Sequence, residues 1–327
     1  MTTLTAMDTP WERGSMLRVL VLLPTYNEAA NLEGIVEAIL RESADTSDTD
    51  VLIIDDNSPD GTGQIADMLH TCHPMRVHVL HRPSKEGLGR AYAAGYAWAL
   101  ASDYDVVAQM DADLSHDPAD LPRLVSVVVE GADVVVGSRY VPGGQTPGWP
   151  WRRRLLSWAG SRYAAALLGL PVRDITGGFK AFSKRALSAL AVTAPRAAGF
   201  AIQIETTSVA YWRGLVVCEV PIVFRDRRAG SSKMSRGIVL EALLLPWRLR
   251  GASIHRSALG SRTHATSGRQ SFTHGAPLRG CGRSAQRQAR RRAQNAAACA
   301  HYSEAAAAVS PRPSGAGCTT RLDTVGE

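Results

Sequence analysis

The sequence predicts an α/β fold built on a doubly wound, mainly parallel sheet with helices on both faces. Two observations lead to this prediction. Short apolar runs, typical of strands buried on both faces, alternate with longer segments whose apolar residues recur at helical spacing. Such alternation is typical of parallel sheets, because each helix carries the chain back to begin the next strand in the same direction. The chain of 327 residues, 45% of them hydrophobic, is long enough to bury such a core.

The predicted elements succeed one another in order along the chain. The strands are 17–23, 50–56, 76–81, 106–110 and 133–137, and the helices are 28–42, one from about residue 60, 87–101 and 117–130. Small residues dominate 87–101, so we expect this helix to pack closely on the sheet. After Tyr140 come a loop rich in glycine and proline (142–150), an amphipathic helix headed by arginines (151–168) and a further loop. A helix around Glu205, a strand at 216–224 and an apolar helix at 237–247 complete the series.

Composition divides the chain into three parts: a loose N-terminus at 1–16, one folded domain at 17–250, and a tail at 251–327. The tail contains few branched aliphatic residues and cannot bury enough apolar surface to offset chain entropy. We predict that it is a disordered basic appendage or a frameshifted terminus. Its eleven arginines and three acidic residues give a net charge of +8, which leaves residues 1–250 near −1. The overall charge of +7 therefore does not indicate nucleic-acid binding by the folded part.

The cysteines and the apolar runs bear on the cellular compartment. Cys72 and Cys218 are the only cysteines in the first 250 residues, and no pair among the five has the spacing of a zinc or redox site. We therefore expect inert thiols in a reducing compartment. The apolar run 19–23 is too short for a signal peptide, and no uninterrupted apolar stretch reaches the ~18 residues of a transmembrane helix.

The central motif of the sequence is MDADLSHDP, at 110–118. Asp111 and Asp113 come directly after the strand 106–110, and ligands of open α/β sheets bind outside the carboxyl ends of strands. Two carboxylates one residue apart make a hard-oxygen site for Mg²⁺ or Mn²⁺. The alternative is that one aspartate caps the next helix, since Asp117 and Pro118 indicate a helix start.

Two other predicted strands also end in residues that suit a nucleotide. A rigid turn after the first strand presents Pro24, Tyr26 and Glu28, and Asp55 and Asp56 end the second. The next segment, 57–62, reads as a turn that opens a helix, so Ser58 and Asp60 taken alone favour structural roles. The turn after the first strand is not rich in glycine and no Walker lysine motif occurs, which argues against a dinucleotide-binding dehydrogenase or a P-loop protein.

Seven ordered motifs then carry a resemblance: LPTYNE, IIDDNSPDGT, KEGLGRA, MDADLSHDP, VVGSRY, RDITGGFK and FRDRRAGSSKM. Together, over about residues 17–249, they resemble the polyprenol-phosphate (dolichyl-phosphate) mannosyltransferases of glycosyltransferase family 2. The resemblance implies a GT-A fold for the domain 17–250. It also implies transfer of mannose, with inversion, from GDP-mannose to a polyprenyl phosphate. The enzyme would then be peripheral on the cytoplasmic, inner face of a membrane.

The resemblance also assigns roles to residues. The nucleotide sugar would bind among Pro24, Tyr26, Glu28, Asp55, Asp56, Lys85, Asp111, Ala112 and Asp113. The divalent metal would be held by Asp111, Asp113 and Ser115, although relatives often have Gln at the position of Ser115. The acceptor phosphate would contact Arg139, Arg153, Ser157, Arg227 and Lys233. The residues expected to act in catalysis are Asp111, Asp113, Arg139 and Arg227.

Further positions in the motifs have less direct roles. The loop 174–179 is expected to line the sugar pocket, with Gly177 where relatives have serine. His116 is interpreted as a surface histidine in a turn. Independently of the resemblance, arginines from separate segments suit a phosphate acceptor, because a guanidinium makes planar, two-pronged contacts with phosphate oxygens.

Several alternatives remain open at this point. The donor could be UDP-glucose or another sugar nucleotide, or the chain could be an inactive nucleotide-sugar-binding subunit, which Ser115, Gly177 and the unusual tail would favour. The arginine-rich tail could bind DNA. Arg152 and Arg154 are interpreted as a solvated face or as contacts with anionic lipid, and the segment 238–247 as lying on the bilayer or in the core. A separate membrane-anchoring subunit is a further candidate partner.

Overall fold

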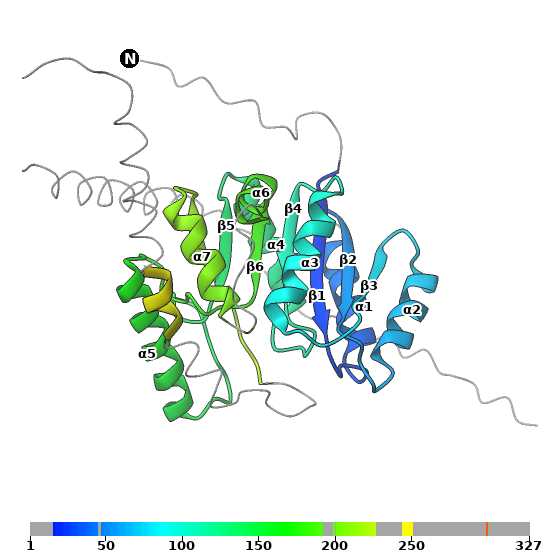
Figure 1. Ribbon diagram of the computed structural model, residues 1–327, viewed down its shortest axis with the longest axis horizontal. Helices are drawn as coiled ribbons and strands as arrows, with labels where there is room; N and C mark the ends of the chain where they lie inside the picture. Colours follow the sequence, from blue (N-terminus) through cyan, green and yellow to red (C-terminus); the bar gives the residue numbers. More distant parts are fainter. Residues whose placement is uncertain are drawn as a thin grey trace, which may run out of the picture.

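The computed structural model describes residues 16–44, 47–191, 199, 201–226, 244–250 and 299. In this part of the chain one seven-stranded sheet has the strand order β3-β2-β1-β4-β6-β5-β7 (Figure 1). The strands are β1 (Arg18–Thr25), β2 (Asp48–Asp55), β3 (Val77–His81), β4 (Val106–Gln109), β5 (Val134–Ser138), β6 (Lys180–Ser183) and β7 (Val217–Pro221). The helices are α1 (Leu32–Ser43), α2 (Thr62–Cys72), α3 (Leu88–Leu100), α4 (Leu121–Val129), α5 (Trp151–Leu168), α6 (Lys184–Ala191) and α7 (Ile202–Trp212), with a 3₁₀ turn, η2 (Pro118–Asp120).

The predicted fold class is confirmed. Strands β3, β2, β1 and β4 are parallel neighbours, and β5 and β7 form a second parallel pair. Each predicted strand is present within a few residues of its expected bounds, and the helix predicted at 151–168 has those bounds. The sequence pattern missed β6 and α6. Strand β6 is short and antiparallel to both of its neighbours, β4 and β5.

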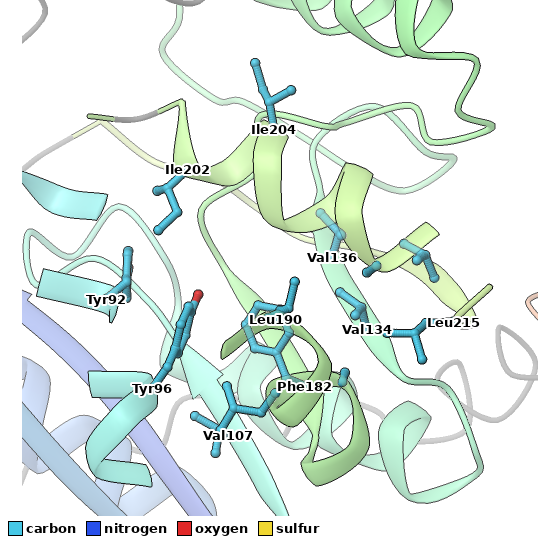
Figure 2. Packing of buried hydrophobic residues seen from close by; sticks show 14 of the residues in the cluster. Tyr92, Tyr96, Val107, Val134, Val136, Phe182, Leu190, Ile202, Ile204 and Leu215 are labelled. Carbon is cyan, nitrogen blue, oxygen red and sulfur yellow. The ribbon is translucent and has the colours of Figure 1, made fainter. Parts of the chain in front are cut away.

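Helices cover both faces of the sheet, as the sequence predicts. One buried cluster joins the sheet to α3, α5, α6 and α7, and the other joins it to α1, α2 and α4 (Figure 1). Figure 2 shows the first cluster, in which Tyr96 of α3 makes an edge-to-face contact with Phe182 of β6 at 5.8 Å between ring centroids. The expectation that α3 packs closely is confirmed at Gly95, where a Cβ would lie 2.7 Å from Cδ1 of Ile54.

Helix α5 differs from the amphipathic helix that the sequence predicts. Its N-terminal half buries no side chain, and the buried residues begin only at Ser161. Four large apolar side chains of this half are exposed: Trp151, Leu155, Leu156 and Trp158. The helical residues 244–250 lie beside α5, because Nε1 of Trp247 donates to the hydroxyl of Tyr163 at 2.8 Å (Figure 1).

The cysteine prediction is wrong for two residues. Cys218 of β7 forms a disulfide with Cys299, 81 residues further along the chain, whereas Cys72 is free and exposed. Spacing along the sequence does not reveal a pair that only the sheet brings together. Apart from Cys299, the predicted tail lies outside the described residues, as do residues 1–15 and 227–243. No helix in the described ranges is both long enough and apolar enough to cross a bilayer.

Candidate active site

The turns after β1 and β2 are joined by hydrogen bonds from the backbone of one to the side chains of the other. The N–H of Asn27 donates to Ser58 Oγ at 3.1 Å, and the N–H of Ala29 donates to Asp60 Oδ2 at 3.2 Å. The N–H of Glu28 donates to Thr62 Oγ1 at 3.0 Å. The structural roles expected for Ser58 and Asp60 are therefore confirmed. These hydrogen bonds fix the positions of the two turns relative to each other on this side of the site.

Asp55 and Asp56 have partners within the chain. Asp55 accepts from the hydroxyl and the N–H of Ser58 at 2.5 and 3.2 Å. Asp56 forms an ion pair with Arg82 at 2.5 Å, and Arg82 also contacts Glu86 at 2.7 Å. Burial raises the pKa of the Asp56 carboxyl, and the charge of Arg82 opposes this rise. Both aspartates are thus buried and held by partners within the chain, next to the turn after β2.

Tyr26 and Lys85 are the predicted nucleotide residues that the structure leaves accessible and brings together. Tyr26 is half-buried, Lys85 is exposed, and Lys85 Nζ lies 3.7 Å from the centroid of the Tyr26 ring. A cation over an aromatic face is attracted by the electrons of the ring. The pair gives the site a flat aromatic surface next to a positive charge on a long side chain, which suits a base and its ribose or phosphate.

The MDADLSHDP turn begins where β4 ends. The side chain of Asp111 is 24% exposed. Asp113 is 4% exposed, and its Oδ1 accepts the N–H of Ser115 at 3.1 Å. Leu114, which lies between Asp113 and Ser115, has a φ of 61°, a left-handed conformation that a residue with a bulky side chain rarely adopts. Such strain persists only where the surrounding structure enforces it, and it clusters at functional sites.

The sequence left open that Asp111 or Asp113 caps the next helix, but Asp117 has this role. Asp117 Oδ1 accepts the N–H of Ala119 at 3.1 Å and caps η2. Asp111 and Asp113 are therefore not needed to start this helix. Two carboxylates alone make an incomplete metal shell, and the described residues contain no cluster of three or more His, Cys, Asp or Glu arranged to hold a metal.

The interpretation of His116 as a surface residue is wrong. Its side chain is 2% exposed, and its ring packs against Phe179 and Phe224 at 5.2 and 5.4 Å between centroids. Nδ1 accepts the N–H of Asp111 at 3.0 Å, so the ring supplies the acceptor that this N–H lacks at the strand end. Burial lowers the pKa of His116, and the imidazole is neutral at pH 7.

Two glycines occupy the space between the ends of β4 and β5. Gln109 of β4, Lys180 of β6 and Val136 of β5 lie side by side, so Gly177 and Gly178 reach the same edge of the sheet as Asp111. A Cβ on Gly178 would lie 3.7 Å from the carboxylate of Asp111.

Gly177, the position at which the resemblance leads one to expect serine, has little space for a side chain. A Cβ on this residue would lie 2.9 Å from the carbonyl oxygen of Gly137 and 3.1 Å from Val136 Cγ1. The absence of side chains at both glycines lets this loop pack closely against the end of β5 and beside Asp111.

Arg139 lies directly after β5 and is held by Asp174. Its Nε and Nη2 donate to the two oxygens of Asp174, each at 2.7 Å. The charge of Asp174 raises the pKa of Arg139 despite burial, and Arg139 holds the pKa of Asp174 below its usual range. The sequence pattern assigned the loop 174–179 to the sugar pocket and did not reveal this pair.

A cavity of about 630 Å³ opens beside Arg139. Its lining combines residues after β5, the loop 142–150 and one side of α5: Arg139, Tyr140, Val141, Gly144, Gln145, Thr146, Pro147, Trp151, Arg154, Leu155 and Trp158. Aromatic and aliphatic side chains thus share the walls with two arginines. The sequence pattern assigned none of these residues except Arg139 to an acceptor site.

The other predicted acceptor residues lie near the cavity. Arg153 Nη1 donates to Asp226 at 2.7 Å, and its guanidinium lies 4.0 Å from the ring centroid of Trp149. The hydroxyl of Tyr140 donates to Oγ of Ser157 at 2.6 Å. Neither Arg153 nor Ser157 lines the cavity, whereas Arg154, for which the sequence favours a solvated face or a contact with lipid, does. Arg153 and Arg154 are neighbours in α5, and they differ only in the direction in which each side chain leaves the helix.

Arg227 and Lys233 lie outside the described residues. The last described segment before them does reach the site, because the N–H of Arg225 donates to the carbonyl of Ser115 at 3.1 Å. The N–H of Phe224 donates to the carbonyl of Gln145 at 2.9 Å. Residues 222–226 therefore cross from the cavity loop to the MDADLSHDP turn.

Comparison with known proteins identifies the family. The model of the family "Glycosyl transferase family 2" matches residues 20–191, more than half of the chain. The chain belongs to glycosyltransferase family 2.

Within family 2, it is 45% identical over 236 residues to the polyprenol monophosphomannose synthase of Mycolicibacterium smegmatis, covering 72% of this chain and 88% of that protein. It is 47% identical over 228 residues to the undecaprenyl-phosphate mannosyltransferase of Micrococcus luteus, covering 70% of this chain and 92% of that protein.

Solved structures of lower identity share the fold. The mannosyl-3-phosphoglycerate synthase of Rubrobacter xylanophilus matches with a TM-score of 0.55 and 18% identity, over 80% of this chain and 79% of that one. The glucosyl-3-phosphoglycerate synthase of Mycobacterium tuberculosis, solved in complex with Mn²⁺, UDP and glucosyl-3-phosphoglycerate, matches with a TM-score of 0.52 and 22% identity, over 70% and 80% of the two chains. These matches confirm the GT-A type of fold for this family 2 member.

Proposed function

We propose that this glycosyltransferase moves mannose from GDP-mannose to a polyprenyl phosphate, with inversion at the anomeric carbon. The observation that carries the proposal is the arrangement of one sheet edge. An acid pair lies after β4, an arginine beside a cavity with aromatic and aliphatic walls lies after β5, and two glycines lie between them. The names of the relatives at 45–47% identity support the same sugar and the same class of acceptor.

The donor would bind on the side of β1, β2 and β4. Tyr26 and Lys85 would receive the guanosine, with Pro24 and Glu28 on the same turn and with Asp55 and Asp56 beneath it. The diphosphate would lie at Asp111, Ala112 and Asp113.

The residues present fit a divalent cation. Mg²⁺ in nucleotide sites is usually held by one or two carboxylates, substrate phosphate oxygens and water, so two aspartates would complete such a shell together with the bound diphosphate and water. Asp111 and Asp113 would be the ligands, with Ser115 as a third, weaker one. Mg²⁺ or Mn²⁺ bound there would offset the charge that develops on the departing GDP. The Mn²⁺ and UDP in the structure of the mycobacterial neighbour make such a cation plausible.

The acceptor would enter from the cavity. Its phosphate would lie at Arg139, with Arg154 as a second cation in the same lining, and its first prenyl units would contact Trp151, Leu155 and Trp158. Arg153 and Ser157 would support this group from the adjacent turn of α5. We assign Arg227 and Lys233 to the same phosphate, because they follow closely after Arg225, whose N–H donates to the carbonyl of Ser115 at the site.

The chemistry needs little proton transfer. A phosphate monoester has a second pKa near ~6, so the acceptor is already largely dianionic at neutral pH and can attack without a strong general base. The arginines would align this oxygen and neutralise its charge, while the acid pair holds the leaving group on the opposite side of the glycines. An attack from the side opposite the leaving group inverts the anomeric carbon.

The membrane is the proposed source of the acceptor. The exposed apolar residues of α5 stand beside Arg152, Arg154 and Arg162, and no acidic residue occurs in this helix. Aromatic and apolar side chains among arginines suit the interface of an anionic bilayer. We place the protein on the inner, cytoplasmic face, with a separate anchoring subunit as a candidate partner and without a role for nucleic acid.

A transfer assay with radiolabelled donors tests the proposal. Incubation with polyprenyl phosphate in detergent should move label from GDP-mannose into the organic phase, and EDTA should stop the transfer. Label moving from UDP-glucose instead would indicate the other donor. Binding of GDP by calorimetry with no lipid product from either donor would indicate an inactive subunit.

A further inference from the structure

The guanidinium of Arg139 is held in one orientation by a buried carboxylate. Asp174 is fully buried and accepts from Nε, Nη2 and the backbone N–H of Arg139, at 2.7, 2.7 and 3.0 Å. Nη2 also donates to Thr176 Oγ1 at 2.8 Å. An arginine side chain has five N–H donors, so these bonds use Nε and both hydrogens of Nη2. No described residue accepts a hydrogen bond from Nη1, so its two hydrogens are the ones that can serve a ligand.

The surroundings of Arg139 restrict where that ligand can be. The guanidinium lies 5.1 Å from the ring centroid of Tyr140, 5.8 Å from that of Trp149 and 5.5 Å from that of Phe224. Arg139 also lines the cavity. The aromatic rings surround the group without accepting conventional hydrogen bonds, and the cavity is the space from which a polar ligand can approach it.

Asp174 is itself fixed from behind. Glu219 of β7 accepts the N–H of Asp174 at 2.8 Å and that of Arg173 at 2.7 Å. Ser161 of α5 accepts the N–H of Ile175 at 3.0 Å. The carboxylate is therefore anchored to the sheet and to the helix whose N-terminal half forms one wall of the cavity.

We propose that Asp174 is a positioning residue for the acceptor: it holds Arg139 so that the Nη1 edge receives the phosphate of polyprenyl phosphate. This inference rests on the proposed function. A guanidinium binds phosphate well only when its plane faces the phosphate oxygens. If that plane is already fixed in the free protein, the side chain loses little freedom when the phosphate binds. Asp174 also cancels the charge of Arg139, and Arg154 in the same cavity supplies the positive charge that a dianion then needs.

The opposite end of β5 offers a matched control. Asp133, directly before this strand, is buried and pairs with Nε of Arg185 at 2.7 Å and with its Nη2. It also accepts the N–H of Val216 at 2.8 Å. Both aspartates thus bind an arginine in two-pronged fashion and a backbone N–H, but of these two only Asp174 lies beside the cavity.

The experiment compares Asp174→Asn with Asp133→Asn. For each we would measure thermal unfolding, the KM for polyprenyl phosphate and for GDP-mannose, and calorimetric binding of farnesyl phosphate as a short soluble probe. Both variants should lose stability. Only Asp174→Asn should raise the acceptor KM and weaken farnesyl phosphate binding, by about tenfold or more, with the KM for GDP-mannose within about twofold. Thr176→Val, a milder change at the same Nη2, should give a smaller rise.

Three outcomes would overturn the inference. An unchanged acceptor KM in both Asp174→Asn and Thr176→Val would mean that the pair is only structural. A lowered acceptor KM would mean that Asp174 competes with the phosphate for Arg139. A wild-type protein that neither transfers mannose nor binds farnesyl phosphate would refute the proposed function itself, and the inference with it.

Discussion

Asp113 is the buried member of the acid pair, and its substitution separates chemistry from folding. Asp113→Asn keeps the shape and the acceptor for the Ser115 N–H but removes the charge. We expect transfer to fall by at least ~10²-fold, because a metal at the leaving group contributes several kcal/mol of charge stabilisation. Turnover in detergent, with circular dichroism for the fold, measures this.

Asp117→Asn is the matched control in the same turn. Asp117 caps η2, and asparagine caps helices about as well as aspartate. Turnover should therefore stay within about threefold of the wild type. Equal losses in the two variants would show that the turn matters only for its shape.

Gly177 gives a prediction about stability. In Gly177→Ala the new Cβ would lie 2.9 Å from the carbonyl oxygen of Gly137, so the backbone must shift. We expect a loss of about 1–3 kcal/mol in the free energy of unfolding, measured with urea. Gly160→Ala in α5, where no atom lies within 4 Å of the new Cβ, should instead gain about 0.5–1 kcal/mol. A Gly177→Ala variant as stable as the wild type would contradict the steric account.

At the scale of elements, strand β6 joins the two parallel halves of the sheet and is tied to α7 by one buried lysine. Lys180 donates to the carbonyl of Gln203 at 2.7 Å and to the hydroxyls of Thr206 and Thr207 at 3.1 and 2.9 Å. Burial lowers its pKa to about 7. The ordinary value in the unfolded chain is ~10.4, so between these values the unfolded state holds a proton that the folded state lacks.

Stability should therefore rise with pH through this window, by up to ~1.4 kcal/mol per pH unit. Lys180→Met removes the group and should flatten the rise between about pH 7.5 and 9.5 in urea unfolding. Lys184→Met, at an exposed lysine of the adjacent helix α6, should keep the wild-type slope. The same slope in Lys180→Met as in the wild type would refute the assignment.

Helix α5 carries the prediction about the membrane. Leu156 is 69% exposed and does not line the cavity, so Leu156→Ser should weaken flotation with anionic vesicles and leave turnover in detergent unchanged. Burial of one leucine contributes about 1.5–3 kcal/mol, which corresponds to roughly tenfold or more in the partition. Met75→Ser, at a residue 80% exposed near β3, should change neither. Equal flotation of both variants would place the membrane surface elsewhere.

At the scale of the whole molecule, the features that could be predicted from the sequence are those that depend on periodicity. The periodicity of buried apolar strands and amphipathic helices predicted the layers, and the acids at strand ends predicted the sheet edge at which we propose that the donor binds. Strand β6 escaped prediction because four residues between a glycine-rich loop and a helix have no detectable period. Pairs such as Arg139 with Asp174 and Cys218 with Cys299 depend on contacts between distant segments, which no local pattern encodes. The cavity was not predicted because it depends on the exposure of the N-terminal half of α5, whereas the composition of this helix predicted that one face is buried.

The configuration of the lipid product tests the central claim most directly. In the proposed function, the acid pair after β4 would bind the leaving diphosphate through a divalent cation, and Arg139 after β5 would bind the nucleophile with Arg154 of α5, so one displacement should occur between them. With GDP-α-D-mannose and polyprenyl phosphate, NMR of the purified product should show mannose linked to phosphate in the β configuration. An α-linked product, or none at all from an active preparation that binds both substrates, would contradict this account.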